Sequence, residues 1–260
     1  MRTSNPTLND NIFSSGSTLT GGQVMTVQGM VNKTFILLGL LIAAAAWIWY
    51  KVIQPTGVVG LEVTTLARDN QAAVMPFVFG GGIVGFILAL VTVFKKEWSM
   101  VTAPLYAVCE GLVLGGISAF FEMQYPGIVM QAVALTFSTL LCLLLAYKFG
   151  LIHVTEKFRT GVIVATGAIA LVYIVSMVLG FFHVAVPFMQ GNSIFSIGFS
   201  LFVVGIAALN LVLDFDMVER GEEVGAPKYM EWYCAFSLMV TLVWLYLEIL
   251  RLLSKLRSRD

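Results

Sequence analysis

Three carboxylates are the candidate ionisable residues of the long apolar runs. They are Glu110, Asp214 and Glu248. A charged side chain at the centre of a membrane helix costs about 2.5–3.5 kcal/mol, so it usually faces a cavity or a partner. We therefore take the three acids as candidates for a gate or an ion pathway. The alternative is that each is protonated and only packs helices together.

Other polar residues accompany two of these acids. Asn210 lies one helical turn before Asp214, and Ser237 and Thr241 lie eleven and seven residues before Glu248. These spacings return to the same face of a helix, so the sequence predicts a polar seam beside Glu248.

Two neighbouring charges have two interpretations each. Asp216, like Asp214, either belongs to the ion pathway or ends a helix in the headgroup layer. Arg251 follows Glu248 by three residues and could pair with it. It could also extend to the membrane surface together with Lys255, and we favour that second interpretation.

Composition indicates what must position these acids. The chain of 260 residues is 58% hydrophobic and 12% charged, whereas soluble domains carry about 25% charged residues. Six apolar runs have 19 to 23 residues and a first one has 16, close to the roughly 20 that a membrane helix needs. The sequence predicts an all-α polytopic membrane protein with seven transmembrane helices, at 35–50, 72–94, 100–121, 127–147, 160–182, 193–213 and 232–250. They form one domain at 34–260, preceded by a polar arm at 1–33 that is loose or interfacial.

Several function classes are excluded or disfavoured. Fifteen basic and fifteen acidic residues give no net charge, whereas a nucleic-acid partner requires a basic stripe. The only two histidines, His153 and His183, lie in or beside loops, so neither a nucleophile–base pair nor a histidine metal site is supported. We expect no enzyme and no cofactor, and the residues assign no metal ligands.

Paired glycines indicate close helix contacts. The segment 79–85 is rich in glycine but lacks the Lys-Ser/Thr of a phosphate-binding loop. Gly81 and Gly85, and likewise Gly111 and Gly115, are four residues apart, the spacing that lets membrane helices approach closely.

Basic residues indicate the orientation. Nine lie in the arm and the second, fourth and sixth loops, and six lie on the other side. The positive-inside rule then places the N-terminus and the loop at 148–159 in the cytoplasm, and 124–127 and 182–192 outside.

Three motifs carry a family resemblance. They are Tyr-Ala-Val-Cys-Glu-Gly-Leu-Val-Leu-Gly at 106–115, Leu-Asp-Phe-Asp-Met-Val at 213–218 and Leu-Tyr-Leu-Glu at 245–248. In this order the chain resembles the Bax inhibitor-1 superfamily, which includes the bacterial YccA-like proteins and the lifeguard proteins. The start of the chain, at 1–6, is similar to a bacterial branch.

The resemblance implies a bundle in which the seventh helix is central. It also implies a pH-sensitive calcium leak gated by two carboxylates, which correspond by position to Asp214 and Glu248. The chain departs from the family pattern in three ways. Residue 248 is glutamate instead of aspartate, the loop between the two acids is longer, and the second run has no arginine to latch the pair.

We therefore expect a cation leak in a bacterial inner membrane, with Ca²⁺ as a possible permeant ion. One alternative is a membrane scaffold or stress-response regulator of another membrane protein such as a protease, docked through the arm at 1–33. Another is a proton-coupled transporter that uses the same acids. The sequence leaves the oligomeric state open.

The distance between the two gate acids is a further expectation. Two adjacent carboxylates would share a proton and titrate as a pair. A seventh helix that starts at Tyr229 places Glu248 about 28 Å along its axis, on the far side of the membrane from Asp214. Pairing therefore requires 217–235 to form an interfacial excursion before the last span.

Overall fold

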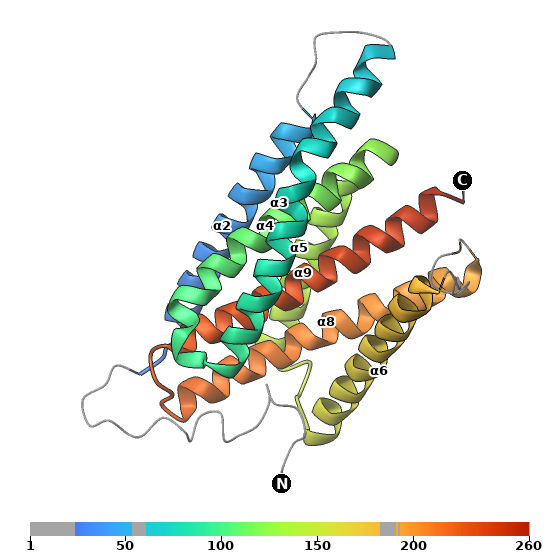
Figure 1. The fold of residues 1–260 in the computed structure, drawn as a ribbon. Coiled ribbons are helices and arrows are strands. Elements are labelled where there is room, and N and C mark those ends of the chain that lie inside the picture. The colour runs from blue at the N-terminus through green and yellow to red at the C-terminus, as the bar shows by residue number, and fades with distance from the viewer. Residues whose placement is uncertain (1–23, 54–60, 183–190, 192, 260) are drawn as a thin grey trace. The chain divides into compact units, whose positions relative to one another are not determined.

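The computed structural model describes residues 24–53, 61–182, 191 and 193–259, and this part of the chain is helical (Figure 1). Within these residues there are seven long helices and one 3₁₀ turn, η1 (Lys96–Trp98), which precedes the third helix. All seven are long and apolar enough to cross a membrane, which confirms the predicted fold class. The helices are α2 (Val27–Ile53), α3 (Leu61–Phe94), α4 (Ser99–Gln124), α5 (Ile128–Lys148), α6 (Glu156–Phe181), α8 (Ile194–Glu223) and α9 (Met230–Arg257).

Most helices extend beyond the apolar runs that predicted them. The first begins at Val27, so residues 27–33 of the predicted polar arm are helical, and residues 1–23 lie outside the described part. The sixth continues to Glu223. Backbone hydrogen bonds require no apolar side chain, so a helix can continue past the hydrocarbon into the headgroup layer.

The described helices form two compact units. The N-terminal unit comprises residues 24–124 and 220–239, and in it α4 packs against both α2 and α3 (Figure 1). Part of its core is a cluster of Ile48, Val52, Val74 and Ala119. The C-terminal unit comprises residues 125–219 and 240–259.

Glycines make the close contacts of α4 possible. A Cβ atom added at Gly81 would lie 2.9 Å from the carbonyl oxygen of Cys109. A Cβ atom at Gly115 would lie 2.6 Å from the carbonyl oxygen of Ala45, and one at Gly111 would overlap that of Leu41. The prediction of close helix contact at these glycines is confirmed.

Gly111→Ala is expected to destabilise the N-terminal unit by about 1–3 kcal/mol, because the added methyl group meets backbone that cannot rotate away. Thermal unfolding in detergent measures the effect. The matched control is Gly39→Ala on α2, where a Cβ atom meets nothing within 4 Å. Equal stability of the two variants would contradict the contact.

In the C-terminal unit, a hydrogen bond joins α8 to α6 and an aromatic contact joins α8 to α5. The side-chain amide of Asn210 donates a hydrogen bond of 2.8 Å to Thr166 Oγ1 on α6. The rings of Tyr147 on α5 and Phe215 on α8 lie 5.9 Å apart. These contacts fix the register of α8 against α5 and α6.

The last helix is the most buried of the seven. In its most apolar stretch 56% of the residues are buried, against 11% for α6.

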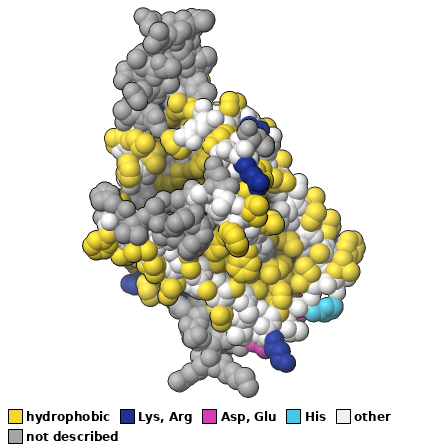
Figure 2. All heavy atoms as spheres, turned by 90° about the vertical axis from the view of Figure 1, so that its right-hand side faces the viewer, with side chains coloured by type: hydrophobic (Ala, Val, Ile, Leu, Met, Phe, Trp, Pro, Cys, Tyr) yellow, Lys and Arg dark blue, Asp and Glu magenta, His cyan; other side chains and the backbone are white. Residues whose placement is uncertain are grey.

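The outer surface is apolar. Hydrophobic side chains gather over much of the described surface in Figure 2, and only a few charged ones lie among them. Large side chains such as Phe86, Met130 and Leu171 are more than half exposed. A surface of this kind fits lipid, because it would be unfavourable in water.

Candidate functional site

Two of the candidate acids lie inside α8. Because the helix continues to Glu223, Asp214 and Asp216 are not helix-end residues, and the structure corrects that interpretation. Both are buried, with exposed fractions of 7% and 8%. Asp216 accepts a hydrogen bond of 2.5 Å from the guanidinium of Arg159 on α6, which is itself buried.

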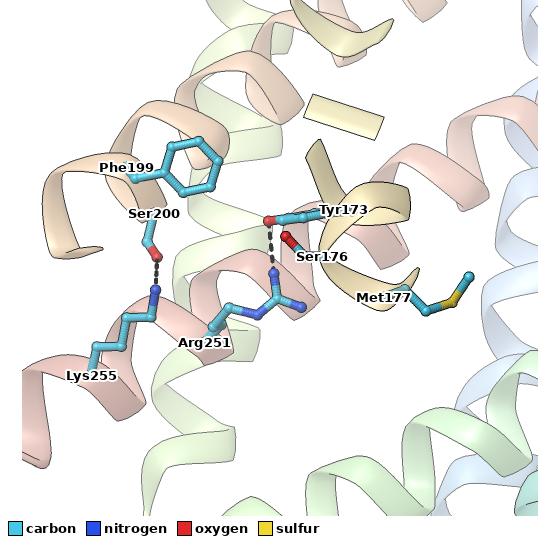
Figure 3. A pocket seen from close by; sticks show the side chains of 7 residues that line it. All are labelled: Tyr173, Ser176, Met177, Phe199, Ser200, Arg251 and Lys255. Atoms are coloured by element: carbon cyan, nitrogen blue, oxygen red, sulfur yellow. Dashed lines mark hydrogen bonds between the residues drawn. The ribbon is translucent and has the colours of Figure 1, made fainter. Parts of the chain in front are cut away.

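Glu248 is the centre of a polar group that joins α9 to α6. Its side chain is 2% exposed. Its Oε1 accepts hydrogen bonds from the Tyr173 hydroxyl at 2.9 Å and from the Trp244 indole at 3.3 Å. Nη1 of Arg251 donates to both carboxylate oxygens, at 3.0 and 3.1 Å. It also donates to the Tyr173 hydroxyl at 2.7 Å (Figure 3).

The two cations at the end of α9 differ from the interpretation that we favoured. Arg251 pairs with Glu248, although 43% of its side chain stays exposed. Lys255 does not extend to the surface. It is buried, and its ammonium donates to Ser200 Oγ at 2.8 Å and to the Ser196 carbonyl at 3.3 Å.

Helix geometry separates Asp214 from Glu248. Asp214 lies nine residues before the end of α8, and Glu248 lies eighteen residues after the start of α9. Measured along the helix axes from the turn that joins them, these positions correspond to about 14 Å and 27 Å. The interfacial excursion that pairing requires is not formed, because 217–223 belong to α8 and 230–235 to α9. The expected carboxyl–carboxylate pair therefore has no geometric basis.

The remaining candidates lie on α4 and α9. Glu110, in the N-terminal unit, is half-buried and hydrogen-bonded by the Tyr106 hydroxyl. Its carboxylate lies close to α3, because a Cβ atom added at Gly85 on that helix would be 3.9 Å from Glu110 Oε2. On α9, Ser237 and Thr241 are half-buried. Because the helix runs unbroken through both to Glu248, their spacing keeps all three on one face, as predicted.

A family comparison agrees with this arrangement. The model of the family described as Bax inhibitor 1 like matches residues 5–258, nearly the whole chain. The chain belongs to the Bax inhibitor 1 like family. No curated protein and no solved structure matches it significantly.

Sequence reasoning missed one buried charge of this Bax inhibitor 1 like protein. Glu231, at the start of α9, has a fully buried side chain that pairs with Lys33 and, at 2.9 Å, with Lys228. It also accepts a hydrogen bond of 3.0 Å from the Thr26 backbone. The i,i+3 spacing from Lys228 was a usable signal, whereas nothing in the sequence links Glu231 to residues about 200 positions earlier.

Two partners of the predicted acids were also missed. Tyr173 is one of several residues with a hydroxyl group in an apolar run, and Arg159 entered only the count of basic loop residues. The sequence indicates no partner for either residue, because Arg159 and Asp216 are 57 residues apart and Tyr173 and Glu248 are 75 residues apart.

A metal site of the usual kind is not formed in the described part of the chain. No three His, Cys, Asp or Glu side chains there lie together in a way that could hold a metal ion.

Proposed function

We propose that this multi-pass membrane protein conducts cations, Ca²⁺ among them, through the C-terminal unit, and that protons regulate the flux. The observation that supports the proposal most directly is the burial of Asp214 and Glu248 within membrane-spanning helices. Acids at such depth are rare and usually line a path for ions or protons. The proposal makes the protein an ion leak and not an enzyme.

The chemistry of the acids favours a cation. Carboxylate oxygens are preferred ligands of Ca²⁺, and the two acids lie at different depths along their helices, so they provide successive positions for one ion. Protons compete with Ca²⁺ for the same oxygens, so flux should fall as the pH falls.

Arg251 would hold the closed state. Its guanidinium neutralises Glu248 and bonds to both carboxylate oxygens, and Tyr173 bonds to one of them. A permeant cation has to displace this ion pair. The resemblance implied a latch arginine on the second helix, and α3 does include Arg68 because it begins at Leu61, but the side chain of Arg68 is outside the description.

Calcium flux from liposomes that contain the purified protein tests this function. We expect Ca²⁺ release above that of empty liposomes, rising with pH, and no requirement for a gradient of another ion. Release equal to that of empty liposomes would contradict conduction. A strict requirement for a proton or sodium gradient would instead identify a coupled transporter.

The proposed location is a bacterial inner membrane with the N-terminus in the cytoplasm. Pro126 and His153 are exposed in loops at the two ends of α5. In a cysteine-free background, Pro126→Cys should react with an impermeant maleimide in whole cells, and His153→Cys should react only after lysis. The opposite pattern would reverse the orientation.

A further inference from the structure

A cavity in the C-terminal unit is lined by two positively charged side chains, Arg251 and Lys255, and the proposed conduction assigns a role only to Arg251. Its volume is about 420 Å³, and α6, α8 and α9 all contribute to its lining (Figure 3). The polar side chains that line it are Tyr173, Ser176, Ser200, Arg251 and Lys255.

The cavity has an excess of positive charge. Arg251 and Lys255 are four residues apart on α9 and both line it, whereas Glu248 is the single carboxylate that the described residues show paired with Arg251. The ammonium of Lys255 is bonded to two neutral oxygens, those of Ser200 and Ser196. A buried cation whose partners are all neutral favours an anion beside it.

Hydrogen-bond donors remain for such an anion. Every bond of Arg251 that the described residues show uses Nη1, whereas a guanidinium carries five N–H donors. The planar arrangement of those donors matches the oxygens of a phosphate group.

The cavity lies near one end of the three helices that line it. Tyr173 is eight residues before the end of α6, Ser200 is six after the start of α8, and Arg251 is six before the end of α9. At 1.5 Å per residue these positions are about 9–12 Å from the helix ends. Two apolar side chains, Met177 on α6 and Phe199 on α8, also line the cavity, and Met177 is more than half exposed, so acyl chains would lie beside it.

We propose that this cavity binds the phosphate group of an anionic phospholipid, held by Arg251 and Lys255 and by the hydroxyl groups around them. Basic sites between transmembrane helices are a known form of lipid recognition. The proposal does not depend on ion conduction, because it rests on the cavity and its charges.

Native mass spectrometry of the purified full-length protein tests the proposal. The protein is mixed with equal amounts of phosphatidylglycerol, which is anionic, and phosphatidylcholine, which has a phosphate but no net charge. We expect the protein to retain phosphatidylglycerol preferentially. Lys255→Met should weaken this retention about tenfold, because it removes a charged hydrogen-bond donor of similar length. The matched control is Lys51→Met, an exposed lysine near the end of α2.

The outcomes separate the possible sources of the phosphate. Equal retention of the two lipids by the unaltered protein would overturn the proposal, even if Lys255→Met failed to fold. Equal effects of Lys255→Met and Lys51→Met would also overturn it, because the attraction would then be unspecific. Thermal stabilisation by inorganic phosphate that Lys255→Met abolishes, without lipid preference, would overturn the lipid and identify a soluble phosphate as the ligand.

Discussion

Asp214→Asn and Glu248→Gln are expected to reduce calcium flux independently of each other. Each change removes one carboxylate from the proposed path, and we expect each to lower the flux on the order of tenfold, equivalent to about 1.4 kcal/mol. The double variant should then lose on the order of a hundredfold. Calcium release from liposomes across a range of pH measures all three variants.

Independence follows from helix geometry. The two acids lie about 13 Å apart in depth, from the rise of 1.5 Å per residue, and Glu248 is bonded to Arg251, Tyr173 and Trp244. Effects at sites more than about 7–10 Å apart without shared partners usually add. A pair that shares a proton would behave differently, because either single change would then remove most of the pH dependence.

Glu223→Gln is the matched control, since Glu223 is an exposed carboxylate at the end of α8. We expect it to leave the flux unchanged. A double variant no worse than either single variant would show that the two acids act as a unit and would contradict the separation. Unaltered flux and pH profiles in all three variants would remove both acids from the path and leave Glu110 as the next candidate.

Asp216→Asn is expected to give the largest loss of stability, about 3–5 kcal/mol. The reason is that it leaves the guanidinium of Arg159, with an exposed fraction of 5%, buried without its counter-ion. Unfolding of the purified protein by SDS in mixed micelles measures the loss.

Two further variants identify the cause. The double variant Arg159→Met with Asp216→Leu should recover most of the stability, because apolar side chains of similar volume often replace a buried ion pair without cost. Glu156→Gln is the control, since that side chain is 70% exposed and lies 3.7 Å from Arg159. An exposed pair contributes about 0–1 kcal/mol. A loss below 1 kcal/mol for Asp216→Asn would contradict the buried pair.

The seven helices could be predicted from the sequence because hydropathy is a local property. An uncharged run of about 20 residues has to be helical in a membrane, since hydrocarbon offers no partner for free backbone groups. The contacts at Gly111 and Gly115 were predictable for a similar reason, because glycines four residues apart leave one face of a helix without side chains. The helix ends were predicted less accurately than the helices themselves, since α2 begins eight residues before the run that predicted it.

Of the candidate site, only the buried acids could be predicted from the sequence. Burial of Asp214 and Glu248 follows from their positions in apolar runs, and the structure agrees. The separation of these two acids depends on two features, because α8 continues unbroken to Glu223 and α9 begins at Met230. The polar stretch between the two apolar runs predicted neither feature.

The pairing of Arg251 with Glu248 was one of two interpretations that the sequence offered, because the two residues are three positions apart on one helix. The partners on other helices were decided by the tertiary structure alone. Arg251 contacts Tyr173, Lys255 bonds to Ser200, and Asp216 pairs with Arg159. Each of these contacts depends on how neighbouring helices are rotated and shifted against one another. That arrangement is set by the packing of many side chains at once, so no local pattern in the sequence encodes it.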